Sequence, residues 1–231
     1  MKTVAVFGTG VVGQHLASKL AALGYTVRMG TRDVTATLAK STPDAYGNPP
    51  VAEWLKAYPQ VQLVAYSEVA VDADLLFNAT SGGATLAALQ AAGADALRGK
   101  VLIDIANPLD FSNGMPPSLS VCNTVSLGEQ VQAAFPDTLV VKTLNTLNAY
   151  LMTNPALLKG PHHIFVSSNH AEAKTQVRAL LVEMGWPQES ILDFGDITFA
   201  RATEMLLPIW IRLYMTKGTP MFNFYINDQS A

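Results

Sequence analysis

The sequence contains a single cysteine, Cys122, and it has no long apolar run and no block of like charges. One cysteine excludes an internal disulfide and a C-x-x-C pair, so we expect an inert thiol. The most apolar stretch, 205–215, is interrupted by Pro208 and Arg212 and is far shorter than a membrane span. Lys and Arg are scattered and the net charge is -3, whereas nucleic-acid binding calls for a basic face. We therefore expect no membrane anchor and no nucleic-acid partner.

Several catalytic signatures are also missing from the chain. There is no G-x-S-x-G, no H-E-x-x-H and no Tyr-x-x-x-Lys pair of the short-chain reductases. His162 and His163 are adjacent on an expected strand, where neighbouring side chains point to opposite faces, so they make a poor metal pair. Asp104 lies inside another expected strand and is interpreted as a buried hydrogen-bonding group. We predict no metal site and assign no catalytic side chain.

What the chain does contain is a G-x-G-x-x-G motif near its start, in the run 4–13. A β-branched strand precedes the motif, and an amphipathic helix closed by Gly24 follows it. In such a motif Gly8 makes a tight turn, Gly10 lets the backbone approach a pyrophosphate, and Gly13 lets the helix pack on the strand. The helix N-terminus then favours the anion through its free N–H groups and its macrodipole. The motif predicts a bound dinucleotide; the alternative is a glycine-rich turn with a purely steric role.

The end of the second expected strand, 25–29, indicates which dinucleotide. NAD enzymes usually carry Asp or Glu there for the ribose hydroxyls, but here Gly30-Thr31-Arg32 follows. The guanidinium offers a fork of donors to phosphate oxygens, and Thr31 adds a hydroxyl donor. Asp33 comes one residue later and is expected to cap the next helix. We predict NADP(H) as the cofactor, bound through Thr31 and Arg32; the alternative is that Arg32 is a solvated loop cation.

Strand and helix patterns alternate along the 231 residues, as a doubly wound sheet requires. We predict an α/β fold of the Rossmann type, with a doubly wound, mostly parallel sheet and a small C-terminal helix-plus-strand module. The NADP-binding domain is expected to span 1–195, and a C-terminal helical lid or dimerisation segment to span 196–231. Further strands are expected at 61–66, 75–78, 101–105, 139–143 and 163–167, and helices at 34–40, 52–58, 84–92, 126–135 and 171–184.

Small and polar residues follow three of the expected strands. In an open parallel sheet the ligand lies outside the C-terminal ends of the strands. Each tip alone is also compatible with an ordinary turn, because Asn, Ser, Gly and Pro are common in turns. Three such tips that meet at one crevice favour a ligand site. The candidate cofactor contacts at these tips are Ala79, Thr80, Ser81, Asn107, Pro108, Leu144 and Asn145.

The stretch 197–215 is apolar on nearly every face, with Phe199, Leu207 and Trp210 among its large side chains. A helix of this kind must be buried on more than one side. A dimer interface, an aromatic ligand or packing on the sheet would each cover it. Too few residues follow 195 to build the large helical domain of hydroxyacid or imine reductases. The segment is therefore predicted to act as a lid or platform.

A set of short segments supplies a resemblance to a known family. The segments are Thr9 in the first motif, Thr31-Arg32, 140–146, 193–195, 200–204, Pro208 and 223–224. In this order they resemble the NADPH:deazaflavin (coenzyme F420) oxidoreductase family over nearly the whole chain, and also the cytosolic domain of the six-transmembrane ferric reductases, which use NADPH and a flavin. The resemblance implies hydride transfer between the nicotinamide and a tricyclic ring held under the C-terminal segment. It places Thr9, Gly10, Val11 and Val12 in the pyrophosphate loop, and Thr31 and Arg32 at the 2′-phosphate.

These expectations combine into an NADP-dependent oxidoreductase that transfers a hydride between NADP(H) and a deazaflavin or flavin-like acceptor. Catalysis is expected to rest on positioning the two rings, since no general acid or base is evident. The alternatives are an NADPH-dependent reductase of a small imine or ketone, which needs a proton donor in the cleft, and a non-catalytic NADPH-sensing protein. We expect a small-molecule redox substrate, a homodimer and a cytoplasmic location, the last because the N-terminus leads directly into a strand without a signal-peptide pattern.

Overall fold

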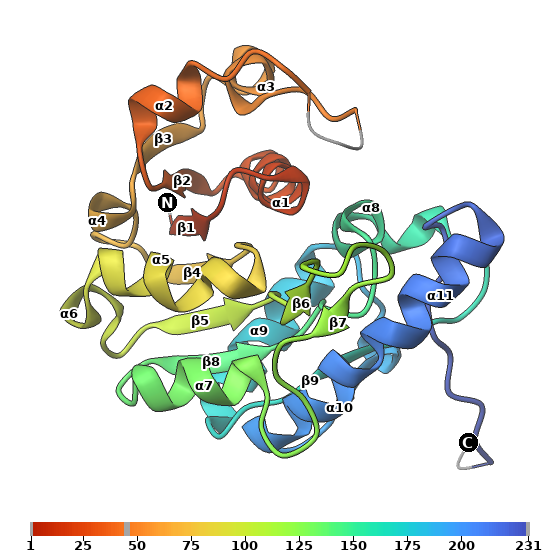
Figure 1. Ribbon diagram of the computed structural model, residues 1–231. Helices are drawn as coiled ribbons and strands as arrows, with labels where there is room; N and C mark the ends of the chain where they lie inside the picture. The colour runs from red at the N-terminus through yellow and green to blue at the C-terminus, as the bar shows by residue number, and fades with distance from the viewer. Residues whose placement is uncertain (1, 44–46, 230–231) are drawn as a thin grey trace.

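Six parallel strands form the central sheet of the computed structural model, which describes residues 2–43 and 47–229 (Figure 1). The strand order is β3-β2-β1-β4-β5-β8, and every neighbouring pair is parallel. The chain leaves β1 toward β2 and β3, then returns to β4 on the other side, which creates the switch point of a doubly wound sheet. The strands are β1 (Thr3–Phe7), β2 (Thr26–Thr31), β3 (Gln62–Ala65), β4 (Leu75–Asn78), β5 (Val101–Asp104) and β8 (Leu139–Lys142).

Helices cover both faces of this sheet. The helices predicted at 34–40, 52–58, 84–92, 126–135 and 171–184 are present within a few residues of their expected bounds. Asp33 caps α2 as predicted, because its side chain accepts from the Ala36 N–H at 2.9 Å. No helix in the part of the chain that the structure describes is long and apolar enough to cross a membrane. The helices are α1 (Val11–Ala22), α2 (Val34–Leu38), α3 (Val51–Ala57), α4 (Tyr66–Val69), α5 (Thr85–Ala92), α6 (Ala94–Leu97), α7 (Leu127–Ala134), α8 (Ala149–Thr153), α9 (Ala171–Glu183), α10 (Ala200–Met205) and α11 (Leu207–Lys217), with 3-10 turns η1 (Gly82–Ala84), η2 (Pro155–Leu157), η3 (Gln188–Ser190) and η4 (Ile197–Phe199).

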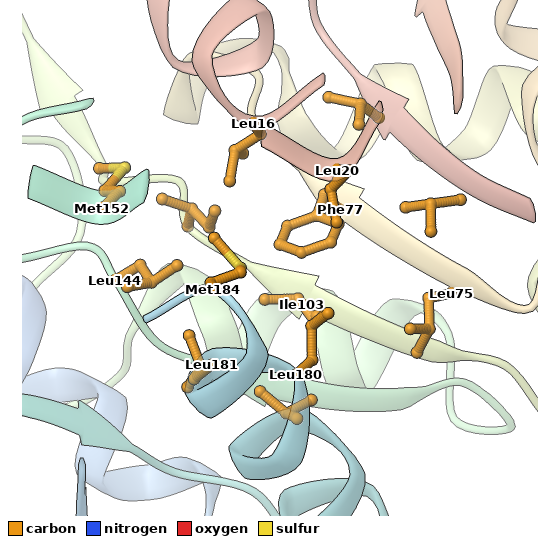
Figure 2. Packing of buried hydrophobic residues seen from close by; sticks show 14 of the residues in the cluster. Leu16, Leu20, Leu75, Phe77, Ile103, Leu144, Met152, Leu180, Leu181 and Met184 are labelled. Atoms are coloured by element: carbon orange, nitrogen blue, oxygen red, sulfur yellow. The ribbon is translucent and has the colours of Figure 1, made fainter. Parts of the chain in front are cut away.

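Two apolar cores lie on opposite faces of the sheet because side chains alternate along each strand. In β1, Val4 and Val6 belong to one core, and Ala5 and Phe7 to the other. The first core joins the sheet to α1, α8 and α9. Figure 2 shows Leu16 and Leu20 of α1 on one side of Phe77 and Ile103, with Leu180 and Leu181 of α9 and Met184 at its C-terminal cap nearby. Because both faces are covered, the strands β1, β4, β5 and β8 are mostly apolar, as parallel strands generally are.

The strand predicted at 163–167 does not extend the central sheet. It forms β9 (Ile164–Val166), which pairs in parallel with β10 (Ile191–Asp193) in a separate two-stranded sheet. An antiparallel bridge between Lys142 and Ser167 joins this small sheet to β8. A second small sheet, the antiparallel pair β6 (Leu109–Asp110) and β7 (Ser118–Leu119), follows β5. Neither β10 nor this pair was predicted, because strands of two or three residues carry little periodic signal.

The C-terminal module differs in detail from the single apolar helix and strand that the sequence suggested. The segment 197–215 is divided into η4, α10 and α11, and Pro208 stands in the first turn of α11, where a missing N–H costs nothing. Leu207 and Ile211 are buried, while Met205 and Ile209 are exposed, so this segment is covered on one side only. The described residues after α11 form no strand; instead the chain runs as an extended tail in which Phe224 accepts a backbone hydrogen bond from His163 at 2.8 Å.

Candidate functional site

The three glycines of the first motif have three different surroundings. Gly8 ends β1 with φ +105°, and a Cβ there would lie 2.6 Å from the carbonyl oxygen of Ala79. A Cβ on Gly13 would lie 2.2 Å from the carbonyl oxygen of Gly8, so only glycine allows α1 to pack this closely on the strand. At Gly10 nothing lies within 4 Å of the added atom. The structure therefore gives Gly8 and Gly13 steric roles, and it leaves open space at Gly10, where a phosphate would approach.

The N-terminus of α1 faces that open space. Gly10 is the N-cap and supplies no side-chain acceptor, and the first turn carries no acidic residue. The first N–H groups and the positive end of the helix dipole are therefore free to bind an anion. The side chain of Gln14 donates to the Thr9 carbonyl at 3.0 Å and holds the loop in place. Beside the loop lies a cleft of about 420 Å³, whose walls include Thr9, Gly10, Val11, Gln14, Thr37 and Lys40.

The residues predicted to bind the 2′-phosphate occupy unlike positions at the tip of β2. Thr31 is buried, and its hydroxyl lies 2.7 Å from that of Thr37, which lines the cleft. Arg32 is exposed and makes no hydrogen bond or ion pair with the described residues. Its charge acts on Tyr66, where burial raises the pKa of the phenol and Arg32 partly opposes the rise. Lys40, also exposed, is a cation on the wall of the cleft that sequence reasoning missed, whereas Arg32 is not among the wall residues. Among the described residues, both cations have free donors for a phosphate, while the Thr31 hydroxyl shares a hydrogen bond with Thr37.

The tips of β4, β5 and β8 meet at a second cleft, of about 430 Å³. The side chain of Asn107 donates to the Asn145 carbonyl at 2.8 Å, and the side chain of Asn145 donates to Asn107 Oδ1 at 2.9 Å. A Cβ on Gly82 would lie 2.1 Å from the Asn107 carbonyl oxygen, so this glycine lets the first two tips approach each other. Of the predicted cofactor contacts, this cleft brings together Val12, Ala79, Thr80, Ser81, Asn107 and Asn145.

Two residues predicted as cofactor contacts turn away from this cleft. Pro108 is buried, and the side chain of Leu144 is 1% exposed and packs in the first core. Leu144 also has φ +58°, a left-handed conformation that costs a non-glycine residue about 1–2 kcal/mol. The left-handed conformation of Leu144 turns the chain sharply just after β8. As a result Asn145 reaches the cleft and the side chain of Leu144 packs in the core. The sequence pattern of a polar strand tip does not reveal which residue of the tip points inward.

An apolar cleft of about 610 Å³ adjoins the second one. The two clefts share walls at Val12, Leu109, Phe111, Leu147 and Trp210. Trp210 of α11 stacks on Tyr214 and on Phe222 of the tail, with ring centroids 5.7 and 5.2 Å apart. A further cavity of about 670 Å³ lies beside β9, β10 and the tail, but it shares no wall residue with either cleft and contains none of the predicted site residues. The site is therefore the pair of adjoining clefts, the strand-tip cleft and the aromatic cleft beside it.

Behind the strand tips lies a buried cluster of three charges that sequence reasoning also missed. Lys142 Nζ is 2.9 Å from Asp104 Oδ2 and 2.8 Å from Glu204 Oε1, and all three side chains are at most 1% exposed. Burial alone would lower the pKa of Lys142, but the two carboxylates outweigh it and hold that pKa above its ordinary value. The signal in the sequence was a charged residue at the end of each of two expected apolar strands, Asp104 and Lys142. The register of β5 and β8 places these two residues side by side.

Glu204 also joins the C-terminal module to the sheet. Its carboxylate accepts hydrogen bonds from the Leu127 N–H at 2.8 Å and the Gly128 N–H at 3.0 Å, at the N-terminus of α7. Arg201, one turn earlier in α10, donates from Nε to Glu129 Oε2 at 2.7 Å. Carboxylates at a helix N-terminus are stabilised by the macrodipole. These contacts fix α10, and through it α11 with Trp210, relative to β5 and β8.

No group of three or more His, Cys, Asp or Glu side chains in the described residues could hold a metal ion. His162 Nε2 lies 3.1 Å from the Pro155 carbonyl oxygen, and His162 Nδ1 lies 3.0 Å from the side-chain nitrogen of Asn223. His163 Nδ1 accepts from the Ile226 N–H at 2.9 Å. Both histidines thus hold the tail, which is the structural role expected of them.

This architecture, with its glycine loop, open helix N-terminus and strand-tip cleft, defines a Rossmann-type dinucleotide-binding protein. Comparison with known proteins gives the family. The family described as "NADP oxidoreductase coenzyme F420-dependent" matches residues 3–108. A solved structure from Arthrobacter sp. FB24, provisionally described as an F420-dependent NADP-reductase, is 53% identical, with a TM-score of 0.93 over 99% of this chain and 100% of that one. The chain belongs to the coenzyme F420-dependent NADP oxidoreductase family, which confirms the resemblance read from the sequence and makes it an NADP-dependent oxidoreductase.

More distant relatives agree with the expected second resemblance. Metalloreductase STEAP3 of Rattus norvegicus is 26% identical over 215 residues, which are 90% of this chain and 37% of that protein. Metalloreductase STEAP2 of Homo sapiens is 28% identical over 211 residues, or 88% of this chain and 35% of that protein. The chain thus spans little more than a third of these relatives. A reductive aminase of Aspergillus terreus, 16% identical with a TM-score of 0.63 over 94% of this chain and 62% of that one, shows the shared fold alone.

Proposed function

We propose that the chain transfers a hydride between NADP(H) and a deazaflavin or flavin-like acceptor, and that the two adjoining clefts hold the two rings. The observation that carries the proposal is the shared wall between the strand-tip cleft and the aromatic cleft, with Trp210 in both. When bound, NADP(H) supplies a hydride donor or acceptor at the nicotinamide C4. The chain's own contribution is to hold a second planar ring against that carbon and to exclude water from the contact.

The residues present fit the dinucleotide. Open space at Gly10 and an uncapped helix N-terminus suit a pyrophosphate, and Arg32 and Lys40 suit a 2′-phosphate because no described carboxylate neutralises either cation. The adenosine half would lie over β2, on the side of these cations. The nicotinamide half would lie over β4 and β5, where the strand-tip cleft opens.

The strand-tip cleft also favours direct transfer over acid–base chemistry. Among the described residues its walls carry no His, Lys, Arg, Asp or Glu side chain, so none of these wall groups is suited to protonate a substrate at neutral pH. A two-electron acceptor ring needs only the hydride at the transfer step and can take its proton from solvent afterwards. The aromatic cleft does contain the phenols of Tyr150 and Tyr214, which are the proton donors that reduction of an imine or ketone would require. Replacing each with phenylalanine therefore separates the two functions: deazaflavin reduction should persist, whereas imine or ketone reduction should stop.

We expect NADPH to bind more tightly than NADH by about tenfold, since charge-assisted hydrogen bonds contribute roughly 1.5–3 kcal/mol. Arg32→Ala should lose most of this preference and Lys40→Ala a smaller part, while affinity for NADH stays unchanged. Titration calorimetry with both cofactors measures the ratio. Arg98→Ala is the matched control, because Arg98 is an exposed arginine that precedes β5, at the end of the strands opposite their tips, and pairs with Asp95. Equal affinities of the native chain for the two cofactors would contradict the assignment.

Trp210→Ala should raise the KM of the acceptor by about tenfold. The reason is that ring stacking on Trp210 is expected to contribute about 1–1.5 kcal/mol or more, which alanine cannot provide. NADPH affinity should fall less, since Gly10 and the cations Arg32 and Lys40, which would hold its phosphates, lie outside both clefts that Trp210 lines. The assay follows NADPH oxidation with deazaflavin, FMN, FAD, a quinone and a ferric chelate in turn. Phe199→Ala is the matched control, because Phe199 belongs to the same module and is 49% exposed. Binding of NADPH without turnover of any acceptor would favour the sensor instead.

A further inference from the structure

The buried charge cluster sets the direction of a chain of hydrogen bonds that ends in the strand-tip cleft. An ammonium group has three donors and no acceptor. Lys142 Nζ directs its three donors to Asp104 Oδ2, Glu204 Oε1 and the Ala106 carbonyl. Both carboxylates therefore act as acceptors toward the lysine. With every donor placed, the cluster has a single arrangement of its protons.

The next member of the chain is the side-chain amide of Asn78 at the end of β4. Its Nδ2 donates to Asp104 Oδ1 at 2.7 Å, and the Ala106 N–H donates to the same oxygen at 3.3 Å. A reversed amide would put a carbonyl oxygen against a carboxylate oxygen, which is repulsive. Asp104 thus orients Asn78 so that its Oδ1 faces Thr80.

Thr80 is the last member, and it lines the cleft. Its hydroxyl donates to Asn78 Oδ1 at 2.7 Å, since an amide oxygen can only accept. A hydroxyl has one proton, so Thr80 Oγ1 can only accept from any other group. The hydroxyl of Thr85, 3.0 Å away, donates its own proton to the Ser81 carbonyl at 3.2 Å, so the Thr80 oxygen keeps an acceptor site for another donor. The wall of the cleft at Thr80 presents a hydrogen-bond acceptor of fixed polarity.

We infer that Thr80 accepts a hydrogen bond from a donor on the nicotinamide riboside of NADP(H), and that Asn78, Asp104 and Lys142 are positioning residues that keep it an acceptor. The inference rests on the proposed function, because the nicotinamide half must lie over β4. Two groups of that half can donate: the carboxamide N–H and the ribose hydroxyls. Either contact would fix the ring against the acceptor, and the three positioning residues are buried behind the cleft wall.

Calorimetry with three ligands distinguishes the carboxamide from the ribose hydroxyls as the donor. The ligands are NADP+, its 3-acetylpyridine analogue, in which a methyl replaces the amino group of the carboxamide, and 2′,5′-ADP, which lacks the nicotinamide riboside. Thr80→Val should weaken NADP+ by about fivefold, the value of one hydrogen bond of about 1 kcal/mol, and leave 2′,5′-ADP unchanged. Thr80→Ser keeps the hydroxyl and should keep native affinity. A loss confined to NADP+ identifies the carboxamide as the donor, and an equal loss for the analogue identifies a ribose hydroxyl.

The positioning role is tested with Asn78→Ala. This variant should lower NADP+ affinity as Thr80→Val does, and adding it to Thr80→Val should cost nothing further, because both remove the same contact. Additive losses would show that Asn78 acts independently and would overturn the positioning role. Native affinity of Thr80→Val for NADP+, or an equal loss for 2′,5′-ADP, would overturn the contact itself. Failure of the native chain to bind NADP+ would instead contradict the proposed function.

Discussion

Gly10→Val should abolish NADPH binding while the chain remains folded. Within the part of the chain that the structure describes, no atom beyond the neighbouring backbone lies within 4 Å of a Cβ at this position, so the Cβ of the valine does not force the protein to shift. Its side chain would instead fill the space through which a pyrophosphate reaches the N-terminus of α1. Loss of two charge-assisted hydrogen bonds corresponds to about 100-fold or more in affinity. Calorimetry measures the binding, and circular dichroism with urea unfolding checks the fold.

Gly13→Ala is the matched comparison, since it adds a smaller group three residues along the same motif. Its Cβ would lie 2.2 Å from the Gly8 carbonyl oxygen, a backbone atom that cannot move without shifting the strand. Overpacking of this kind typically costs about 1–3 kcal/mol, so this variant should unfold at lower urea than Gly10→Val. If Gly10→Val instead binds NADPH normally, the motif is only a structural turn.

Lys142→Met should lower the free energy of unfolding by about 3–5 kcal/mol, because it leaves Asp104 and Glu204 buried without their cation. Adding Asp104→Asn and Glu204→Gln should recover much of the loss. Lys174→Met is the control, since the Lys174–Asp193 pair is partly exposed and is expected to contribute under 1 kcal/mol. A Lys142→Met variant as stable as the control would contradict the account of the cluster.

The pH dependence of this contribution follows from the raised pKa of Lys142. A group whose pKa is higher in the folded state stabilises the fold fully below its ordinary value, 10.5, and the contribution fades as pH rises through the folded pKa. The difference in stability between the native chain and Lys142→Met should therefore stay constant across the neutral range.

The regular part of the fold was predictable because it depends on local patterns. A few neighbouring residues suffice to recognise the apolar strands, the steric roles of Gly8 and Gly13, and the helix cap at Asp33. The small sheet of β9 and β10 was not predictable, because its two strands are short and α9 separates them in the sequence. The same limit applies to the tail, whose contact with His163 joins distant segments of the chain.

The candidate site was predictable by place but not by side-chain direction. The sequence located the strand tips, and the structure brings Thr80, Asn107 and Asn145 to one cleft. The sequence could not show that the Thr31 hydroxyl shares a hydrogen bond with that of Thr37. Nor could it show that the left-handed turn at Leu144 directs this side chain into the core. Lys142 and Glu204 both stand in segments of the family resemblance, but these segments are far apart in the sequence, so the fold is needed to show that the two side chains pair.

The most direct test of the proposed function is the transfer of deuterium from NADPH labelled at C4 of the nicotinamide to an oxidised deazaflavin. Deazaflavin is the suitable acceptor because it takes the hydride on carbon, where the label does not exchange with water. If the chain holds the two rings in contact, one of the two C4-labelled forms should pass its deuterium to the acceptor almost completely, as mass spectrometry of the reduced product would show. Reduced deazaflavin that carries only solvent hydrogen, or NADPH that binds without being oxidised, would contradict direct hydride transfer.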